Sequence, residues 1–219
     1  MIEFDGITFN WLGHDGFLIT SKSGKKICID PYEVSGEFEP ADIIISTHQH
    51  GDHCSLTDIR LFSSSDTEII GIPLSKSVFE KVKYKTIHYV KPGDKVTSHG
   101  ISFEIVPAYN ITKFRSPGVP FHPKEDLHIG IIMDLDGTRI YHTGDTDHIP
   151  EMADFEVDVA LLPVSGTYVM TADEAIEAAN TLKPKLAIPM HFGKIVGDRS
   201  MAEQFKMNAK CKVELPSID

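Results

Sequence analysis

The sequence predicts an α/β protein with two central sheets and helices on the outside. Each half of the 219-residue chain is rich in segments typical of strands, and each half ends in alternating strand and helix patterns. No linker, repeat or low-complexity segment separates the halves. We therefore expect one domain that spans residues 1–219.

Short apolar runs bounded by turn residues predict the strands of the first half. In order, they are expected at 6–12, 16–20, 26–30, 42–47, 68–72 and 85–90. Helical patterns are expected at 56–62, soon after a His-rich loop, and at about 75–83.

The second half follows a similar pattern, with a strand predicted by clear alternation over 101–109. Residues 110–127 are interpreted as a long irregular loop, which in a compact domain is usually functional or disordered. A hairpin turned at Asp136-Gly137 is expected over 128–144, because Asp-Gly favours a tight turn between strands. The remaining elements are strands at 157–164 and 186–191, a helix opened by a capping box at 171–174, and a final helix capped at 200–203.

The composition narrows the classes of function. A formal net charge of −11 argues against a nucleic-acid partner, because phosphate binding normally needs a basic stripe. No apolar run approaches the roughly 20 residues that span a bilayer, and residues 1–5 lack the features of a signal peptide. The three cysteines are scattered and give no disulfide framework. We expect a cytoplasmic enzyme with a small-molecule substrate; the oligomeric state is not readable.

The run His48-Gln49-His50-Gly51-Asp52-His53 is the most informative stretch of the chain. It holds three imidazoles and one carboxylate, the ligand types of Zn²⁺, Fe²⁺ and Mn²⁺, and it follows a predicted buried strand. His48 and His50 point to the same side if the extended conformation persists, whereas Asp52 and His53 follow where the chain turns. One short loop can therefore present two pairs of ligands, which suits two metals better than one.

The pattern His48-x-His50-x-Asp52-His53 matches the HxHxDH signature of the metallo-β-lactamase superfamily. The resemblance to this superfamily covers essentially the whole chain. Within it, the chain is most similar to small metal-dependent hydrolases and to ascorbate-6-phosphate lactonase-like proteins. The segments that carry this resemblance are 11–14, 30–32, 107–110, 141–146 and 188–191. The resemblance implies a four-layer αβ/βα sandwich, with metals in the cleft where the edges of the two sheets meet.

The resemblance also implies the remaining ligands. Asp145, at a strand end after Gly144, matches the aspartate that bridges the two metals in the superfamily. His191, which ends the strand 186–191, resembles the last ligand of the second metal. The implied cofactor is a pair of divalent ions, with Zn²⁺ expected and Mn²⁺ or Fe²⁺ as alternatives. The expected ligands are His48, His50, Asp52, His53, Asp145 and His191.

One position departs from the pattern of the superfamily. Many relatives carry a metal-binding histidine where this chain has Asn110, whose amide oxygen is a weaker, neutral ligand. Either Asn110 coordinates weakly, or His122 in the following loop reaches in, or the first metal is held loosely. His14 resembles residues that approach the metal cleft, and Asp30 resembles a buried aspartate that orients the His-rich loop. The histidines expected to be ordinary strand or turn residues are His88, His99 and His128.

The expected chemistry is hydrolysis. Two ions that share Asp145 and a water would lower the pKa of that water, and the resulting metal-bound hydroxide would attack a carbonyl or phosphoryl centre. Asp52 is the expected catalytic residue, because besides binding the second metal it can orient the water or take its proton. We expect cleavage of a small-molecule ester, lactone or phosphodiester. The alternatives are an RNA or DNA phosphodiesterase and a metal-binding protein without hydrolytic activity.

Two segments are candidates for substrate contact. The loop 110–127 carries Lys113, Arg115 and Lys124, which either contact an anionic substrate or form an exposed basic surface without such a role. Ser165-Gly166-Thr167-Tyr168 follows a strand end and is expected at the mouth of the cleft.

Overall fold

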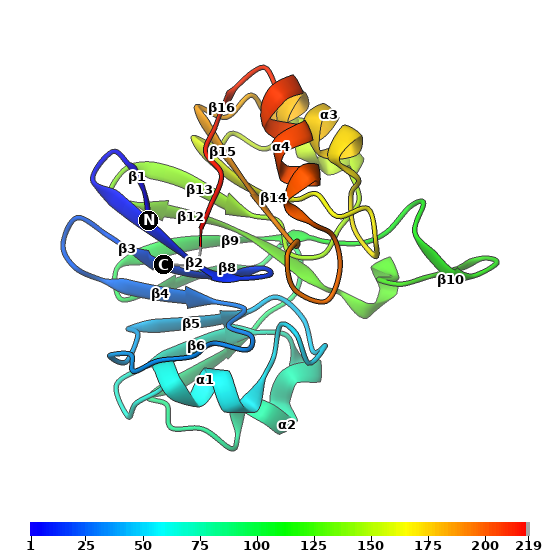
Figure 1. Cartoon of the computed structure of the whole chain (residues 1–219). Helices are drawn as coiled ribbons and strands as arrows, with labels where there is room; N and C mark the ends of the chain where they lie inside the picture. The colour runs from blue at the N-terminus through cyan, green and yellow to red at the C-terminus, as the bar shows by residue number, and fades with distance from the viewer. Residues whose placement is uncertain (218–219) are drawn as a thin grey trace.

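Two seven-stranded sheets form the centre of the computed structural model, which describes residues 1–217 (Figure 1). Helices α1 and α2 lie at the bottom of the view and helices α3 and α4 at the top, with the sheets between them (Figure 1). This arrangement confirms the expected α/β fold with two central sheets and outer helices, the αβ/βα sandwich.

The strands of the first sheet follow one another in sequence order, from β1 to β7. The first four strands pair antiparallel and the last four pair parallel, so β4 belongs to both sets. Their bounds are β1 (Ile2–Phe4), β2 (Ile7–Gly13), β3 (Gly16–Thr20), β4 (Lys26–Ile29), β5 (Ile43–Ser46), β6 (Glu68–Gly71) and β7 (Thr86–Tyr89). Helix α1 (Leu56–Phe62) connects β5 to β6, and α2 (Lys76–Phe79) connects β6 to β7.

The second sheet repeats this plan in the order β16-β15-β14-β13-β12-β9-β8. Its first four strands along the chain are antiparallel and its last four are parallel. Their bounds are β8 (Lys95–Ser98), β9 (Ile101–Pro107), β12 (Ile129–Leu135), β13 (Thr138–His142), β14 (Val159–Pro163), β15 (Leu186–Met190) and β16 (Lys212–Val213). Helix α3 (Ala172–Leu182) connects β14 to β15, and α4 (Arg199–Asn208) connects β15 to β16.

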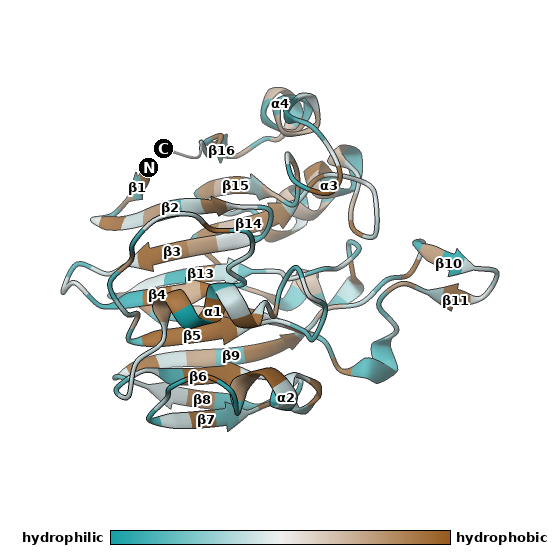
Figure 2. Ribbon diagram, turned by 60° about the horizontal axis from the view of Figure 1, so that its bottom comes forward, coloured by the Kyte–Doolittle hydropathy of each residue, from teal (hydrophilic) through white to brown (hydrophobic). Residues whose placement is uncertain are grey.

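The side chains of the central strands divide between two apolar clusters. In β5, Ile43 and Ile45 join the large cluster between the sheets, whereas Ile44 packs under α1 beside Ile59. This division follows from the alternation of side chains across a strand, and it explains why β5 is apolar at successive positions. Figure 2 shows the resulting apolar colour along the inner strands of both sheets.

Two local predictions are confirmed. The turn between β12 and β13 has positive φ at both Asp136 (54°) and Gly137 (82°), as a two-residue hairpin turn of this type requires. Helix α3 opens with a complete capping box, in which Thr171 accepts from the Glu174 amide and the Glu174 side chain accepts from the Thr171 amide.

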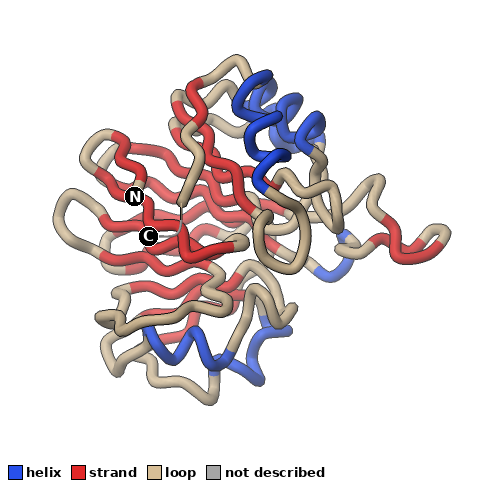
Figure 3. Tube along the Cα trace, in the orientation of Figure 1, coloured by secondary structure: helices blue, strands red, loops and turns tan. Residues whose placement is uncertain are grey.

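Two predicted helix boundaries were wrong, and one segment predicted as an irregular loop contains a hairpin. The helix expected at 75–83 ends at Phe79, because the residues that follow, Glu80 and Lys81, are exposed and extend no apolar face. Helix α4 is capped by Asp198, whose side chain accepts from the Ser200 amide, and not by Ser200 itself. The loop 110–127 contains a short hairpin, β10 (Phe114–Ser116) and β11 (Val119–Pro120), that projects from the body (Figures 1 and 3).

The helices are short. The longest among residues 1–217 is α3, with 11 residues. Over the same range, none combines the length and the apolar character that crossing a bilayer demands.

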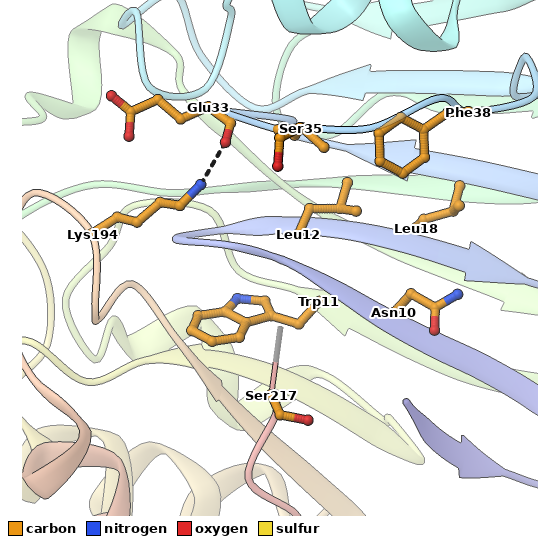
Figure 4. Close-up of a pocket in the computed structure, with 10 residues that line it drawn as sticks. Asn10, Trp11, Leu12, Leu18, Glu33, Ser35, Phe38, Lys194 and Ser217 are labelled. Atoms are coloured by element: carbon orange, nitrogen blue, oxygen red, sulfur yellow. Dashed lines mark hydrogen bonds between the residues drawn. The ribbon is translucent and has the colours of Figure 1, made fainter. Parts of the chain in front are cut away.

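A cavity of about 400 Å³ lies over β2 and β3 (Figure 4). Its walls are mostly Trp11, Leu12, Leu18 and Phe38. Lys194 crosses one side and donates to the carbonyl oxygens of Tyr32 (3.1 Å) and Glu33 (2.8 Å), so loops from the two halves of the chain meet there. None of its lining residues belongs to the His and Asp groups described below, so this cavity is separate from the candidate metal centre.

Glu68 of β6, the strand beside the edge strand β7, connects the first sheet to β8, an edge strand of the second sheet. Its carboxylate accepts from Ser98 of β8 (2.7 Å), from Lys85 (3.0 Å) and from His88 of β7 (3.2 Å). The Ser98 hydroxyl, together with Lys85 and His88, outweighs partial burial and lowers the pKa of Glu68 from 4.5 to about 2. His88 therefore has a structural role, as the sequence predicted.

Replacing Glu68 by Gln is expected to lower the free energy of unfolding at pH 7 by about 1–2 kcal/mol. A lowered carboxyl pKa stabilises the fold above the ordinary value of 4.5, and this contribution is lost as the pH falls from 4.5 toward 2. Urea unfolding at pH 7 and pH 3 should therefore show a smaller difference between the two proteins at pH 3. The exposed Glu37→Gln is the matched control, and an equal difference at both pH values contradicts this account.

Candidate metal centre

Four parallel strands bring the predicted site residues together at their carboxyl ends. The His-rich loop follows β5, Asp145 follows β13, Ser165 and Tyr168 follow β14, and His191 follows β15. In α/β folds the loops after parallel strands meet at one edge of the sheets, and ligands bind there. Residues more than 140 positions apart in the sequence, such as His48 and His191, therefore share one site.

The loop 48–53 is folded tightly between β5 and α1. The amides of His53 and Cys54 both donate to the carbonyl of His50, at 3.0 and 2.8 Å. The Ser46 hydroxyl at the end of β5 donates to the carbonyl of His53 at 2.6 Å. These bonds turn the chain within a few residues, so His48 and His50 face one way while His53 faces another.

One group of three imidazoles consists of His48, His50 and His122, with ligand atoms within 4.8 Å of one another. The His48 Nε2 and His50 Nδ1 atoms are 3.0 Å apart. His122 completes the triangle from the loop 110–127, and its Nε2 lies 3.3 Å from Oδ2 of Asp145. Burial lowers the pKa of all three imidazoles, so they are neutral, which is the form that binds metal.

A second group lies on the other side of Asp145 and contains His53 and His191. The His53 Nε2 is 3.4 Å from Oδ1 of Asp145, and the His191 Nε2 is 3.5 Å from Oδ2. Asp52 lies 3.6 Å from the His53 Nε2 and 3.3 Å from the His14 Nε2. Asp145 therefore lies between the two groups, in contact with imidazoles of both.

In the second group, the nitrogen and oxygen atoms that could bind a metal and that face inward have no hydrogen-bond partner. Within residues 1–217, this holds for the buried Nε2 atoms of His53 and His191 and for Oδ1 of Asp145. Leaving such atoms unpaired costs about 1–3 kcal/mol each, so their convergence calls for a bound partner. A divalent cation fits, because imidazole nitrogen and carboxylate oxygen are its usual ligands.

The outward nitrogens of three of these imidazoles are held by protein groups. His53 Nδ1 meets Asp30 (2.8 Å), His191 Nδ1 meets Ser165 (2.9 Å) and His122 Nδ1 meets Asn110 (3.0 Å). Histidine ligands in metal sites are typically held in this way, because the outer bond fixes the ring orientation and leaves the inner nitrogen free.

The charges of the centre favour a bound cation. Burial alone would raise the pKa of Asp145, but His53 and His191 outweigh it and hold that pKa well below its usual range. Burial likewise works against the charge of Asp52, but the contact with His14 and the charge of His53 lower its pKa to about 2. Both carboxylates are therefore ionised at neutral pH.

Asn110 lies beside the centre but is not placed as a ligand. Its amide oxygen accepts from the backbone and Nδ1 of His122, and its amide nitrogen donates to Asp147 (3.0 Å) and to the carbonyl of Tyr168 (2.8 Å). Of the three alternatives left by the sequence, the geometry favours the second: His122 supplies the third imidazole, and Asn110 orients it.

Asp30 and His14 also lie at the centre. Asp30 is fully buried and accepts from the amide (2.8 Å) and hydroxyl (2.6 Å) of Thr47, in addition to its contact with His53. It therefore anchors both ends of the His-rich loop. His14 is buried beside His191, at 4.1 Å between ring centroids, and neither of its ring nitrogens has a hydrogen bond within residues 1–217.

Sequence reasoning missed two buried residues of the centre. Asp15 joins His53, Asp145 and His191 in a group of close ligand atoms, and burial, with the nearby Asp145 charge, raises its pKa well above the usual range. The signal was the polar pair at 14–15 between two glycines in an otherwise apolar hairpin. His128, expected to be ordinary, stacks on His48 at 4.8 Å.

A two-sheet sandwich with His and Asp groups at its edge defines the class of metallo-β-lactamase-like proteins. The model of the beta-lactamase superfamily domain matches residues 8–191 of this chain. A UPF0173 metal-dependent hydrolase from Archaeoglobus fulgidus is 30% identical, with 92% of this chain and 90% of the relative covered. A crystal structure described as a metal-dependent hydrolase from Parabacteroides distasonis is 35% identical, with a TM-score of 0.81 and 97% and 94% covered. The chain belongs to the beta-lactamase superfamily, among its metal-dependent hydrolases.

Proposed function

We propose that this protein hydrolyses a small-molecule ester, lactone or phosphodiester with the help of two divalent cations. The observation that carries the proposal is the convergence of imidazoles on Asp145 from both sides, with buried, unpaired Nε2 atoms at His53 and His191 on one of them. One cation would be held by His48, His50, His122 and Asp145, and the other by Asp52, His53, His191 and Asp145.

Three imidazoles and a carboxylate suit Zn²⁺, and the carboxylates of the second group also suit Mn²⁺ or Fe²⁺. Cations bound there would acidify a water molecule and polarise the oxygen of the reacting carbonyl or phosphoryl group. His14 and Asp15 also lie beside the second group, close to its ligand atoms.

Asp52 has an exposed edge, with 26% of its side chain accessible, and it lines the pocket in front of Asp145. From this position Asp52 would hold and orient the attacking water or take its proton.

The pocket in front of the centre has a volume of about 220 Å³, which suits a small molecule. Arg115 is the one basic residue other than histidine that lines it, so nothing there forms a track for a nucleic-acid backbone. The position of His122 speaks against a degenerate, non-hydrolytic protein, because His122 would supply the strong third ligand that Asn110 does not. The closer likeness to ascorbate-6-phosphate lactonases stays a prediction.

Metal analysis and a substrate panel test the proposal. We expect about two ions per chain, and hydrolysis within a panel of esters, lactones and phosphodiesters that is lost with a chelator and restored by Zn²⁺ or Mn²⁺. His50→Ala should remove activity and metal, while His148→Ala, outside the centre and bonded to Thr181, should keep both. Fewer than about one ion per chain, together with no hydrolysis of any class, would reject the proposal.

A further inference from the structure

The pocket in front of Asp145 has a second wall that the metal centre does not account for. Four of its seven lining residues, His50, Asp52, His122 and Asp145, belong to the centre. The other three are Arg115, Phe121 and Tyr168, which come from the loop 110–127 and from the segment after β14. Tyr168 thus lies at the cleft, as expected for its segment.

Arg115 differs from the other two basic residues of the loop. Lys113 contacts both oxygens of Glu174, at 2.8 and 2.6 Å. Lys124 contacts Glu151 at 2.8 Å and lies over the ring of Tyr109. Among residues 1–217, no carboxylate lies within 4.0 Å of the Arg115 guanidinium, so its charge is uncompensated by a direct partner.

The guanidinium of Arg115 makes one hydrogen bond to the protein and has further N–H groups without a partner among residues 1–217. One nitrogen donates to the carbonyl of Phe121 at 3.3 Å, and the group lies 5.6 Å from the centroid of the Phe121 ring. A guanidinium has five N–H groups in a planar fork that matches carboxylate and phosphate. Arg115 lines the pocket, and its other N–H groups make no hydrogen bond to residues 1–217.

Phe121 and Tyr168 form an aromatic wall beside this cation. Their rings meet edge to face, with centroids 4.6 Å apart. The carbonyl of Tyr168 accepts from the Asn110 amide, and Asn110 also orients His122. The wall is thus hydrogen-bonded to Asn110, the residue that orients His122.

We propose that the substrate carries an anionic group, a carboxylate or a phosphate, which Arg115 binds while the bond to be cleaved lies at Asp145. An apolar part of the substrate packs on Phe121 and Tyr168. In a chain with a net charge of −11, the charge of Arg115 adds to that of the proposed cations in attracting an anion into the pocket. This inference rests on the proposed function, because it assigns the substrate class of the same site.

Matched substrates test the inference within whichever class the protein hydrolyses. For esters, the neutral probe is phenyl acetate, and the anionic probes are 4-acetoxybenzoate and 4-acetoxyphenyl phosphate, with acetate release followed by NMR. We expect kcat/KM to be about 10- to 100-fold higher for an anionic probe, the range of a charge-assisted hydrogen bond. The anionic probe with the higher kcat/KM shows whether the site prefers a carboxylate or a phosphate group.

Arg115→Gln should abolish this preference while leaving the neutral probe within about 3-fold, and Arg115→Lys should restore part of it. Lys124→Gln removes one positive charge from the same loop outside the pocket, so it should keep the preference. An equal loss for neutral and anionic probes in Arg115→Gln, or no preference in the wild-type protein, would overturn the inference.

A binding measurement separates this inference from the proposed function. Calorimetry with 4-hydroxybenzoate and phenyl phosphate on chelator-treated protein should give a Kd that Arg115→Gln raises at least about 10-fold and Lys124→Gln leaves unchanged. If no substrate class is hydrolysed, the proposed function fails, and equal binding by wild type and Arg115→Gln then rejects the anion site as well.

Discussion

Replacing Asp145 by Asn is expected to lower kcat/KM by about 1,000-fold or more, which corresponds to about 4 kcal/mol. Among residues 1–217, Asp145 is the one carboxylate that contacts imidazoles of both groups, His122 on one side and His53 and His191 on the other. An amide of the same shape keeps the packing but removes the negative charge that both cations would share. Activity on the best substrate of the panel and metal content per chain are the measurements.

The expected result has a second part that separates a metal effect from a folding defect. Asp145→Asn should bind less metal than the wild-type protein but keep the far-UV circular dichroism spectrum, because the side chain keeps its size. Asp66→Asn, on an exposed turn, is the matched control and should change neither quantity. Full metal content with full activity in Asp145→Asn would show that the cations do not depend on this carboxylate.

Replacing Asp30 by Asn is expected to lower the free energy of unfolding by about 3–5 kcal/mol, the typical loss when a buried charged pair is broken. Asp30 is fully buried, and its two oxygens receive the amide and hydroxyl of Thr47 and the ring nitrogen of His53. In Asp30→Asn, an NH2 group that donates replaces one carboxylate oxygen that accepts, so a donor of Thr47 or His53 would be left without a partner. Urea unfolding measures the loss.

The neighbouring Asp42 provides the control for Asp30. Asp42 lies directly before β5, and Asp30 lies directly after β4, so both flank strands of the same sheet. Unlike Asp30, Asp42 is only half-buried, and it contacts Lys25 at 3.0 Å and the Lys26 amide at 2.9 Å. Asp42→Asn should therefore cost only about 1 kcal/mol. Asp30→Asn should also weaken metal binding about 10- to 100-fold by releasing the ring of His53. A loss below that of Asp42→Asn would contradict the anchoring role.

Local patterns predicted most of the fold. The turn at Asp136-Gly137 and the capping box at Thr171 depend on interactions within four residues, so the sequence alone specifies them. The α2 boundary depends on which residues meet the sheet, and tertiary packing ended that helix at Phe79. The hairpin of β10 and β11 carries only weak strand patterning, with all three residues of β10 exposed, and it was not predicted.

The candidate site was predictable where ligands follow strands and not where a loop folds back. Asp145 and His191 follow apolar strands, so their place at the sheet edge follows from the topology. The choice between Asn110 and His122 depends on the hydrogen bond from the Asn110 amide to the His122 carbonyl (2.8 Å), which brings the ends of a 13-residue segment together. No pattern of neighbouring residues in the sequence indicates that residues 110 and 122 come together.

The loop 110–127 has a fixed base and a free tip. At its base, the paired Asn110 and His122 serve the metal centre, while its tip, from Phe114 to Val119, is exposed and carries Arg115. Under the proposed role of Arg115, mutations at the tip are expected to alter which molecules are accepted without disturbing the metal centre. Such a protein can evolve to accept new substrates through single substitutions in this tip, because each substitution would affect substrate binding and leave the metal ligands in place. Libraries randomised over 114–119 are thus a natural starting point for redirecting this enzyme.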